Sequence, residues 1–88
     1  MSVEQKHFHA MRRRKGLTQA FGRTLREARL RAGLSQERLA FRCGVHPTYI
    51  SQMERGLKSP TLDVVAALAK ALSQRPSALI RVAEGDDF

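Results

Sequence analysis

The stretch from Gly44 to Gly56, GVHPTYISQMERG, carries imidazole, hydroxyl and amide side chains between two glycines. Such groups can hydrogen-bond to the edges of DNA bases: a glutamine pairs bidentately with adenine, and a threonine contacts a thymine methyl group or a base edge. The same stretch also has the pattern of an ordinary amphipathic helix that packs on a core. Both interpretations stay open until the rest of the chain is considered.

Other residues capable of chemistry form weaker patterns. His7 and His9 could ligate a metal ion, but two histidines without further ligands are weak evidence, so we expect no metal and no cofactor. The sequence shows no paired carboxylates, nucleophile–base set or phosphate-binding loop, so we do not expect an enzyme. The single cysteine, Cys43, allows no intrachain disulfide and is predicted to be a small core residue.

Charge is distributed unevenly along the 88 residues, whose net charge is +8. Lysine and arginine outnumber acidic residues five to one in residues 1–16 and eight to three in residues 17–60, but number three against four in residues 61–88. This asymmetry fits a highly negative partner, most simply nucleic acid, although an arginine-rich composition can also reflect solubility alone. With no membrane-spanning stretch, no secretory signal and one cysteine, the sequence predicts a cytoplasmic protein without a membrane partner.

Helical periodicity begins at Thr18 and predicts a first helix that ends at Gly33. Two further helices begin at residues suited to the N-cap, Ser35 and Thr61, and another begins at His46, with Pro47 at the first helical position. A short fifth helix begins at Pro76. The inward-facing residues are expected to be Phe21, Leu25, Ala28 and Ala32, then Leu39, Ala40 and Cys43, then Val45, Ile50 and Met53, and then Leu62, Val65, Ala69 and Leu72.

No strand-like alternation occurs, so the sequence predicts an all-α fold. Residues 1–16 are interpreted as a basic, flexible arm, residues 17–82 as the folded domain, and residues 83–88 as an acidic tail. The glycine turn at Gly44 leaves only a few residues between the second and third helices, as in a helix-turn-helix.

The run LSQERLAFRCGVHPTYISQMERG, followed by SPTLDVVAALAKAL, resembles the phage-repressor and Cro-type (XRE-like) helix-turn-helix family over about residues 17–80. The shared features are the LSQ…LA opening, the glycine turn, YIS with the E-x-G that closes the third helix, and the P-x-L that opens the fourth. The resemblance implies a compact, five-helix, lambda-repressor-like domain. It also implies a protein of the bacterial cytoplasm, encoded by a bacterium or by a phage. It also implies a sequence-specific regulator of transcription that binds double-stranded DNA at a palindromic operator as a homodimer, with the third helix in the major groove.

The resemblance also assigns roles to individual positions. Residues matching the outward, base-reading positions of the recognition helix are His46, Pro47, Thr48, Ser51 and Gln52. Other residues match positions that contact the DNA phosphates, namely Ser35, Gln36, Arg38, Arg42, Tyr49, Arg55 and Lys58. For several of them the alternative is capping, edge packing or a solvated surface. Two positions depart from the family pattern: Pro47 has no N–H to donate, and His46 is an unusual cap that could contact a phosphate and make binding pH-sensitive.

The remaining expectations concern stability and assembly. Arg29 and Glu54 match a partly buried ion pair that holds the recognition helix at its angle. Leu79, Ile80 and Val82 are expected to contribute to the dimer interface, with Ser73 and Gln74 departing from the family pattern and leaving the half-site spacing open. The arm could contact DNA through Arg12, Arg13, Arg14 and Lys15. These residues could enter the minor groove, but we favour nonspecific electrostatic attraction to the DNA.

Small regulators of this build include autoregulatory switches, controllers of restriction–modification operons and antitoxins. The alternative function is therefore an antitoxin-like module whose main partner is another protein, with DNA binding secondary. The sequence does not specify such a protein partner.

Overall fold

The computed structural model describes residues 15–85. Within this range the chain forms five helices and no strand: α2 (Lys15–Arg31), α3 (Gln36–Cys43), α4 (Pro47–Glu54), α5 (Leu62–Ala71) and α6 (Pro76–Gly85). The all-α prediction is confirmed. The first helix begins at Lys15 rather than at Thr18, so the last two residues assigned to the basic arm are helical. The predicted sites at His7, His9 and residues 12–14 lie outside the described residues, as does the end of the acidic tail.

The helix ends follow local backbone chemistry. The Oγ of Ser35 accepts the N–H of Arg38 at 3.0 Å, and the Oγ1 of Thr61 accepts the N–H of Val64 at 3.1 Å, so both predicted N-caps are confirmed. Gly44 ends α3 with φ at 70°, a left-handed conformation that costs a glycine little and other residues more. The short turn that follows brings α4 directly after α3.

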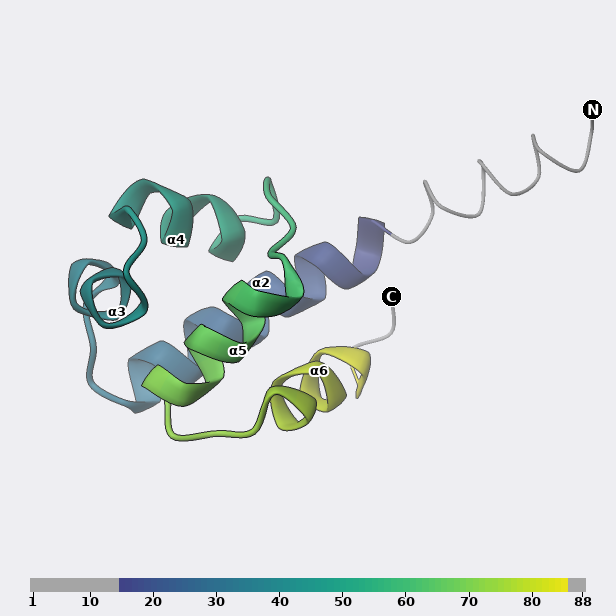
Figure 1. Ribbon diagram of the computed structural model, residues 1–88. Helices are drawn as coiled ribbons and strands as arrows, with labels where there is room; N and C mark the ends of the chain where they lie inside the picture. The colour runs from purple at the N-terminus through teal and green to yellow at the C-terminus, as the bar shows by residue number, and fades with distance from the viewer. Residues whose placement is uncertain (1–14, 86–88) are drawn as a thin grey trace, which may run out of the picture.

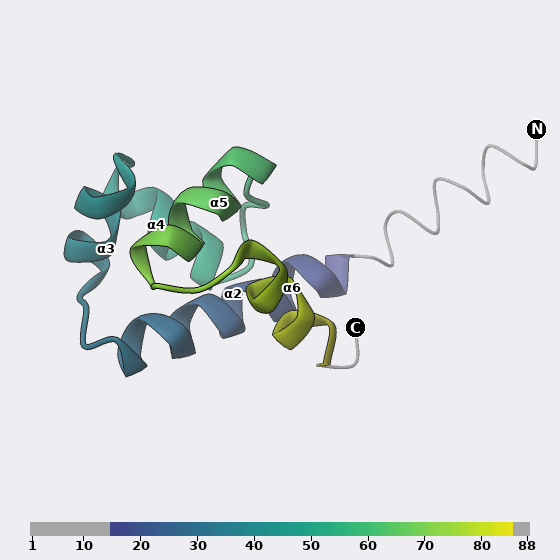
Figure 2. The same ribbon diagram turned by 60° about the horizontal axis from the view of Figure 1, so that its bottom comes forward.

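The helices pack so that α2 supports the helix-turn-helix from below. α2 contacts α4 and α6, α3 contacts α4 and α5, and α5 also contacts α6. In Figure 1, α4 lies at the top of the molecule, with α3 at one end and α6 at the lower right. Figure 2 shows α2 running along the lower side, with α3, α4 and α5 above it. One side of α4 is therefore covered by the bundle, while the other is free.

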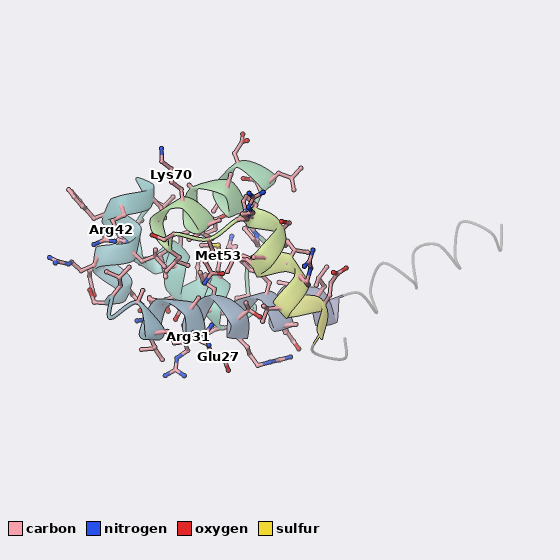
Figure 3. All side chains as sticks on the ribbon, turned by 90° about the horizontal axis from the view of Figure 1, so that it is seen from below. Glu27, Arg31, Arg42, Met53 and Lys70 are labelled. Carbon is pink, nitrogen blue, oxygen red and sulfur yellow. The ribbon has the colours of Figure 1, made fainter. Side chains whose placement is uncertain are left out.

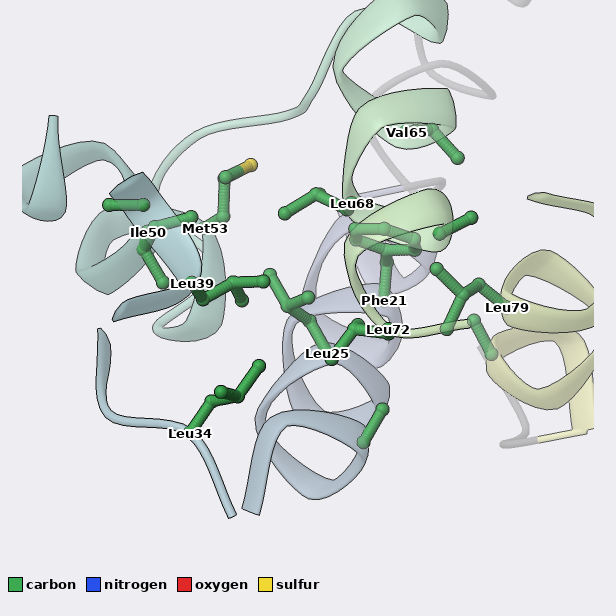
Figure 4. Packing of buried hydrophobic residues seen from close by; sticks show 14 of the residues in the cluster. Phe21, Leu25, Leu34, Leu39, Ile50, Met53, Val65, Leu68, Leu72 and Leu79 are labelled. Carbon is green, nitrogen blue, oxygen red and sulfur yellow. The ribbon is translucent and has the colours of Figure 1, made fainter. Parts of the chain in front are cut away.

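Apolar side chains from all five helices fill the space between them. Leu25, Leu39, Ile50, Leu68 and Leu79 are each at most 1% exposed, and burial of such side chains stabilises a fold by about 1.5–3 kcal/mol each. Figure 3 shows Met53 in the middle of the bundle, whereas Glu27, Arg31, Arg42 and Lys70 project from its periphery. Figure 4 shows Ile50 and Met53 of α4 near Leu39 of α3, with Leu25 and Leu68 further along the core.

Two predicted core residues are exposed. Ala32 follows the last residue of α2, where the chain has already turned, so it no longer continues the buried stripe of Phe21, Leu25 and Ala28. Leu62 is the first residue of α5 and is 87% exposed, because no other helix covers that turn. The predictions for these two residues are wrong. Every other residue predicted to face inward is buried, except Cys43 and Val45, which are half-buried against the core.

A close approach between α2 and α4 depends on Gly22, whose importance the sequence analysis missed. A Cβ at this position would lie 2.7 Å from the carbonyl oxygen of Glu54 and closer still to that of Met53. Both contacts would involve backbone atoms, which cannot swing aside as a flexible side chain can. The absence of a side chain at Gly22 thus lets α2 lie directly against the C-terminal end of α4.

Between Lys15 and Gly85, no helix combines the length and apolar character needed to cross a membrane.

Candidate nucleic-acid interface

The predicted base-reading residues lie on the free side of α4. Successive residues of a helix are rotated by about 100°, so the buried side chains of Ile50, Met53 and Glu54 define the inner face of α4. Thr48 and Gln52 fall on the opposite face, and Ser51 falls at its edge. Thr48 is exposed, whereas Ser51 and Gln52 are half-buried. The fold therefore gathers hydroxyl and amide groups on the outward surface of the second helix of the helix-turn-helix.

The start of α4 is capped by a histidine. The Nδ1 of His46 accepts the N–H of Thr48 at 3.0 Å, and the carbonyl oxygen of His46 accepts the N–H of Tyr49 at 2.9 Å. His46 has extended backbone angles and Pro47 occupies the first turn, as predicted. The imidazole of His46 is exposed, so the cap leaves one side of the ring open to solvent.

Exposed basic side chains follow this helix in the chain and lie on the neighbouring α3. Arg55 directly follows α4, Lys58 lies in the next loop, and Arg38 lies in the first turn of α3; all three are exposed. Arg42 is also exposed, but it lies in the last turn of α3, at the other end of that helix from Ser35. Figure 3 shows Arg42 on the side of the molecule where α3 meets α5. Arg42 is thus set apart from the predicted phosphate-binding start of α3.

The predicted ion pair between α2 and α4 is present and is buried. The Nε of Arg29 donates to Oε2 of Glu54 at 2.6 Å, and its Nη2 donates to Oε1 at 3.0 Å. The side chains of Arg29 and Glu54 are 8% and 2% exposed, and the Nη1 of Arg29 also donates to the carbonyl oxygen of Leu34 at 2.9 Å. The hydrogen bond to Glu54 raises the pKa of Arg29, so this guanidinium is charged at every relevant pH.

Gln36 joins this pair, which the sequence analysis did not predict. Its Nε2 donates to Oε1 of Glu54 at 3.0 Å, so one carboxylate accepts hydrogen bonds from both α2 and α3. The resemblance predicts a contact between the Gln36 side chain and a DNA phosphate. Only one of the two amide hydrogens is needed for Glu54, so the second one and the backbone at the start of α3 remain available for that contact. No local pattern signals this bond, because Gln36 and Glu54 meet only through the packing of α3 on α4.

Two residues with open interpretations pack on the core. Tyr49 is half-buried, and its ring contacts the core cluster, as the alternative of edge packing requires. Cys43 is half-buried too, and its Sγ donates to the carbonyl oxygen of Ala67 on α5 at 3.6 Å. Burial raises the pKa of the Cys43 thiol. Cys43 thus joins α3 to α5 rather than presenting a reactive thiolate.

The C-terminal apolar residues divide between core and surface. Leu79 is 1% exposed and packs inside the domain, so its predicted place in a dimer interface is wrong. Ile80 is half-buried and Val82 is 50% exposed, so both reach the surface. Ile80 and Leu62 also line an apolar groove of about 190 Å³ between α2, α5 and α6, whose other walls include Leu17, Phe21, Pro60 and Val65.

No group of three or more histidine, cysteine, aspartate or glutamate side chains that could hold a metal ion occurs in residues 15–85.

Comparison with known proteins places this arrangement in a family. The helix-turn-helix family model matches residues 25–79, which contain the whole of α3, α4 and α5. The chain is 44% identical over 61 residues to the control protein C.BamHI of Bacillus amyloliquefaciens, covering 68% of this chain and 75% of that protein. It is 47% identical over 51 residues to an HTH-type transcriptional regulator of Mycobacterium tuberculosis, of which it spans only 36%.

Solved structures show the same fold. The clp gene regulator ClgR of Corynebacterium glutamicum superposes with a TM-score of 0.76 at 32% identity, covering 78% of this chain and 73% of that chain. The restriction–modification controller protein C.AhdI of Aeromonas hydrophila superposes with a TM-score of 0.68 at 43% identity, covering 72% and 94%. The chain therefore has the lambda-repressor-like all-α fold. It belongs to the helix-turn-helix family of DNA-binding transcriptional regulators, and its relatives indicate no catalytic family.

Proposed function

We propose that this protein binds a palindromic operator as a homodimer, inserts α4 into the major groove, and controls the genes of a restriction–modification system. The observation that carries the first part is the outward face of α4, where Thr48 and Gln52 lie opposite the buried Ile50 and Met53 and Ser51 lies at the edge. Support for the second part comes from C.AhdI, a similar protein described as a restriction–modification controller, and from C.BamHI, a similar protein described as a control protein.

Base reading falls to the α4 face. Gln52 is the residue that pairs with adenine, and Thr48 contacts a thymine methyl group or a base edge. Ser51, at the edge of the same face, reaches a base or a phosphate. Pro47 can offer only apolar contact, since it has no N–H to donate. Specificity therefore depends mainly on Thr48 and Gln52.

Contacts to the phosphates surround that face. Arg55 and Lys58 follow α4 and are exposed, so they can reach the backbone on one side of the groove. The start of α3, at Ser35 and Gln36, presents backbone N–H groups and the positive end of the helix dipole to another phosphate. Arg38, Arg42 and Tyr49 add weaker contacts. Such interactions position a protein on DNA without carrying sequence information.

A homodimer supplies the second recognition helix. One helix reads only a few base pairs, which is too little to define one site in a genome. The groove lined by Leu62 and Ile80 offers an apolar surface for the second copy. Val82, which is 50% exposed, adds an apolar side chain elsewhere on α6. An 87% exposed leucine beside an apolar groove is the kind of surface that association covers.

The DNA-binding proposal is tested by two substitutions on DNA upstream of the protein's own gene, with a scrambled duplex as competitor. Gln52→Ala should lower affinity for the cognate site by about 1–3 kcal/mol and relax preference at one base position. Arg55→Ala should weaken binding to both duplexes alike and reduce the salt slope by about one. Arg31→Ala is the matched control, because it removes the same charge from an exposed position on α2. Equal losses on both duplexes for Gln52→Ala would refute its role as a reader.

The dimer is tested by Leu62→Glu in analytical sedimentation, with and without DNA. Glutamate in the first turn of α5 is favourable for the helix, so the substitution should leave the monomer folded while weakening association. Phe41→Glu is the control, since Phe41 is also 87% exposed but lies on α3. A wild-type protein that is monomeric both free and on its operator would rule out the dimer.

A further inference from the structure

The histidine that caps α4 has a defined tautomer. A backbone N–H can only donate, so the Nδ1 of His46, 3.0 Å from the N of Thr48, must be the unprotonated nitrogen. In the neutral ring, the hydrogen therefore resides on Nε2. An exposed imidazole free in solution would exchange between two tautomers, whereas the cap selects one. His46 thus presents a hydrogen-bond donor on the side of its ring away from the helix.

This donor compensates for the lack of backbone donors at the start of α4. Pro47 has no N–H, the N–H of Thr48 is bound by the ring of His46, and the N–H of Tyr49 is bound by the carbonyl of His46. The N–H groups that usually bind an anion at a helix start are therefore already used or missing here. The Nε2–H is oriented by the same hydrogen bond, from the N–H of Thr48 to Nδ1, that caps the start of α4. That bond also polarises the ring and strengthens the outer donor.

The position of the ring directs this donor toward DNA. His46 immediately precedes the first turn of α4, and the N-terminal residues of a recognition helix are the ones that contact base edges. In the major groove the acceptors are N7 of either purine, O6 of guanine and O4 of thymine, whereas cytosine presents the N4 amino donor. A ring held with its hydrogen on Nε2 is attracted to the former and repelled by the latter.

We propose that His46 is a specificity-determining residue, whose capped imidazole donates from Nε2 to a base-edge acceptor and disfavours cytosine at that position of the contacted strand. The inference rests on the proposed function, since it requires α4 to lie in the major groove. It goes beyond the roles of Thr48 and Gln52, because the histidine reads a base only in the tautomer that its capping bond imposes.

His46→Asn separates capping from reading. The asparagine Oδ1 occupies nearly the place of Nδ1 and is among the best caps, but the shorter side chain has no donor at the position of Nε2. We expect the thermal midpoint of His46→Asn to equal or exceed that of the wild type, whereas His46→Ala should lower it by about 4–8 °C. Thr61→Asn, which exchanges the cap of α5 in the same way, is the matched control.

Selection from a randomised duplex library, followed by sequencing of the bound DNA, measures the base preference. The wild type and Thr61→Asn should exclude cytosine at one position of each half-site. His46→Asn should accept all bases there, with a loss of about five- to 150-fold on the wild-type site. An unchanged preference in His46→Asn would overturn the proposal. So would an equal loss on every sequence with a smaller salt slope, since that would identify a phosphate contact.

Nitrogen–proton correlation spectra of the neutral ring test the tautomer itself, with His46→Asn assigning the signals. A hydrogen on Nε2 is expected, and a hydrogen on Nδ1 would overturn the inference. Failure of the proposed function would give a different result: the wild type itself would enrich no sequence from the library, which would show that it does not bind DNA specifically. Enrichment by the wild type with full preference retained in His46→Asn would refute only the role of His46.

Discussion

Removal of one partner from the buried ion pair should destabilise the whole domain. Arg29→Met leaves the carboxylate of Glu54, whose side chain is 2% exposed, with the hydrogen bond from Gln36 but without its cationic partner. Three hydrogen bonds are lost, two to Glu54 at 2.6 and 3.0 Å and one to the carbonyl oxygen of Leu34 at 2.9 Å. Hydrogen bonds to charged groups contribute about 1.5–3 kcal/mol each, and breaking a buried pair costs about 3–5 kcal/mol. Because Gln36 still donates to Glu54, we expect a loss near the lower end, about 3 kcal/mol.

Urea denaturation followed by circular dichroism measures this loss. For a domain of this size, about 3 kcal/mol corresponds to a fall of about 12–24 °C in the thermal midpoint. The double variant Arg29→Met, Glu54→Leu removes both charges together, so its free energy of unfolding should return to within about 1 kcal/mol of the wild type. The DNA affinity of the double variant should remain below that of the wild type, because the ion pair that holds the end of α4 against α2 is absent.

Two results would refute this reasoning. A loss below about 1 kcal/mol for Arg29→Met would mean that the pair behaves as an exposed salt bridge. A double variant as unstable as the single one would mean that packing, rather than an uncompensated charge, accounts for the loss.

Two further predictions concern the contacts that position α4 and α3. Gly22→Ala should destabilise the domain, since the clash with the α4 carbonyls, about 1–3 kcal/mol, outweighs the helix propensity of alanine. Gly85→Ala, whose Cβ would meet nothing within 4 Å, is the control. Equal urea midpoints for Gly22→Ala and the wild type would contradict the close approach of α2 and α4. Because burial raises the pKa of Cys43, its thiol stays protonated to higher pH than in the unfolded chain. Alkylation by iodoacetamide at neutral pH should therefore be slower in the native protein than in urea, and equal rates would exclude this effect.

The helix ends could be predicted from the sequence because capping is local. Ser35 and Thr61 accept N–H groups only three residues ahead, and Gly44 adopts the left-handed angle that ends α3. Even the unusual cap at His46 was predicted, since Pro47 at the next position strongly favours a helix start. These interactions depend on side chains and backbone within one turn, so no distant contact is needed to specify them.

The faces of the helices were predicted less completely. Periodicity identified Ile50 and Met53 as buried, and the resemblance to a known family assigned Thr48 and Gln52 to the outward side of the same helix. Periodicity failed for Leu62, which was expected in the core and is exposed. Leu79 was expected at a dimer interface and lies in the core instead. An apolar residue at a helix end is buried only if another element covers that turn, and periodicity within one helix contains no information about its neighbours.

The sequence by itself therefore determined the capped ends of α3, α4 and α5 and the pattern that signals the helix-turn-helix. Its resemblance to a known family supplied the partners of the Arg29–Glu54 pair. Tertiary packing alone decided that Gln36 binds Glu54, that Gly22 must lack a side chain, and that Leu62 is left uncovered. The physical reason is one of range. Caps and turns involve atoms a few residues apart, whereas these contacts exist only after α2, α3, α4 and α5 have taken their places around a common core.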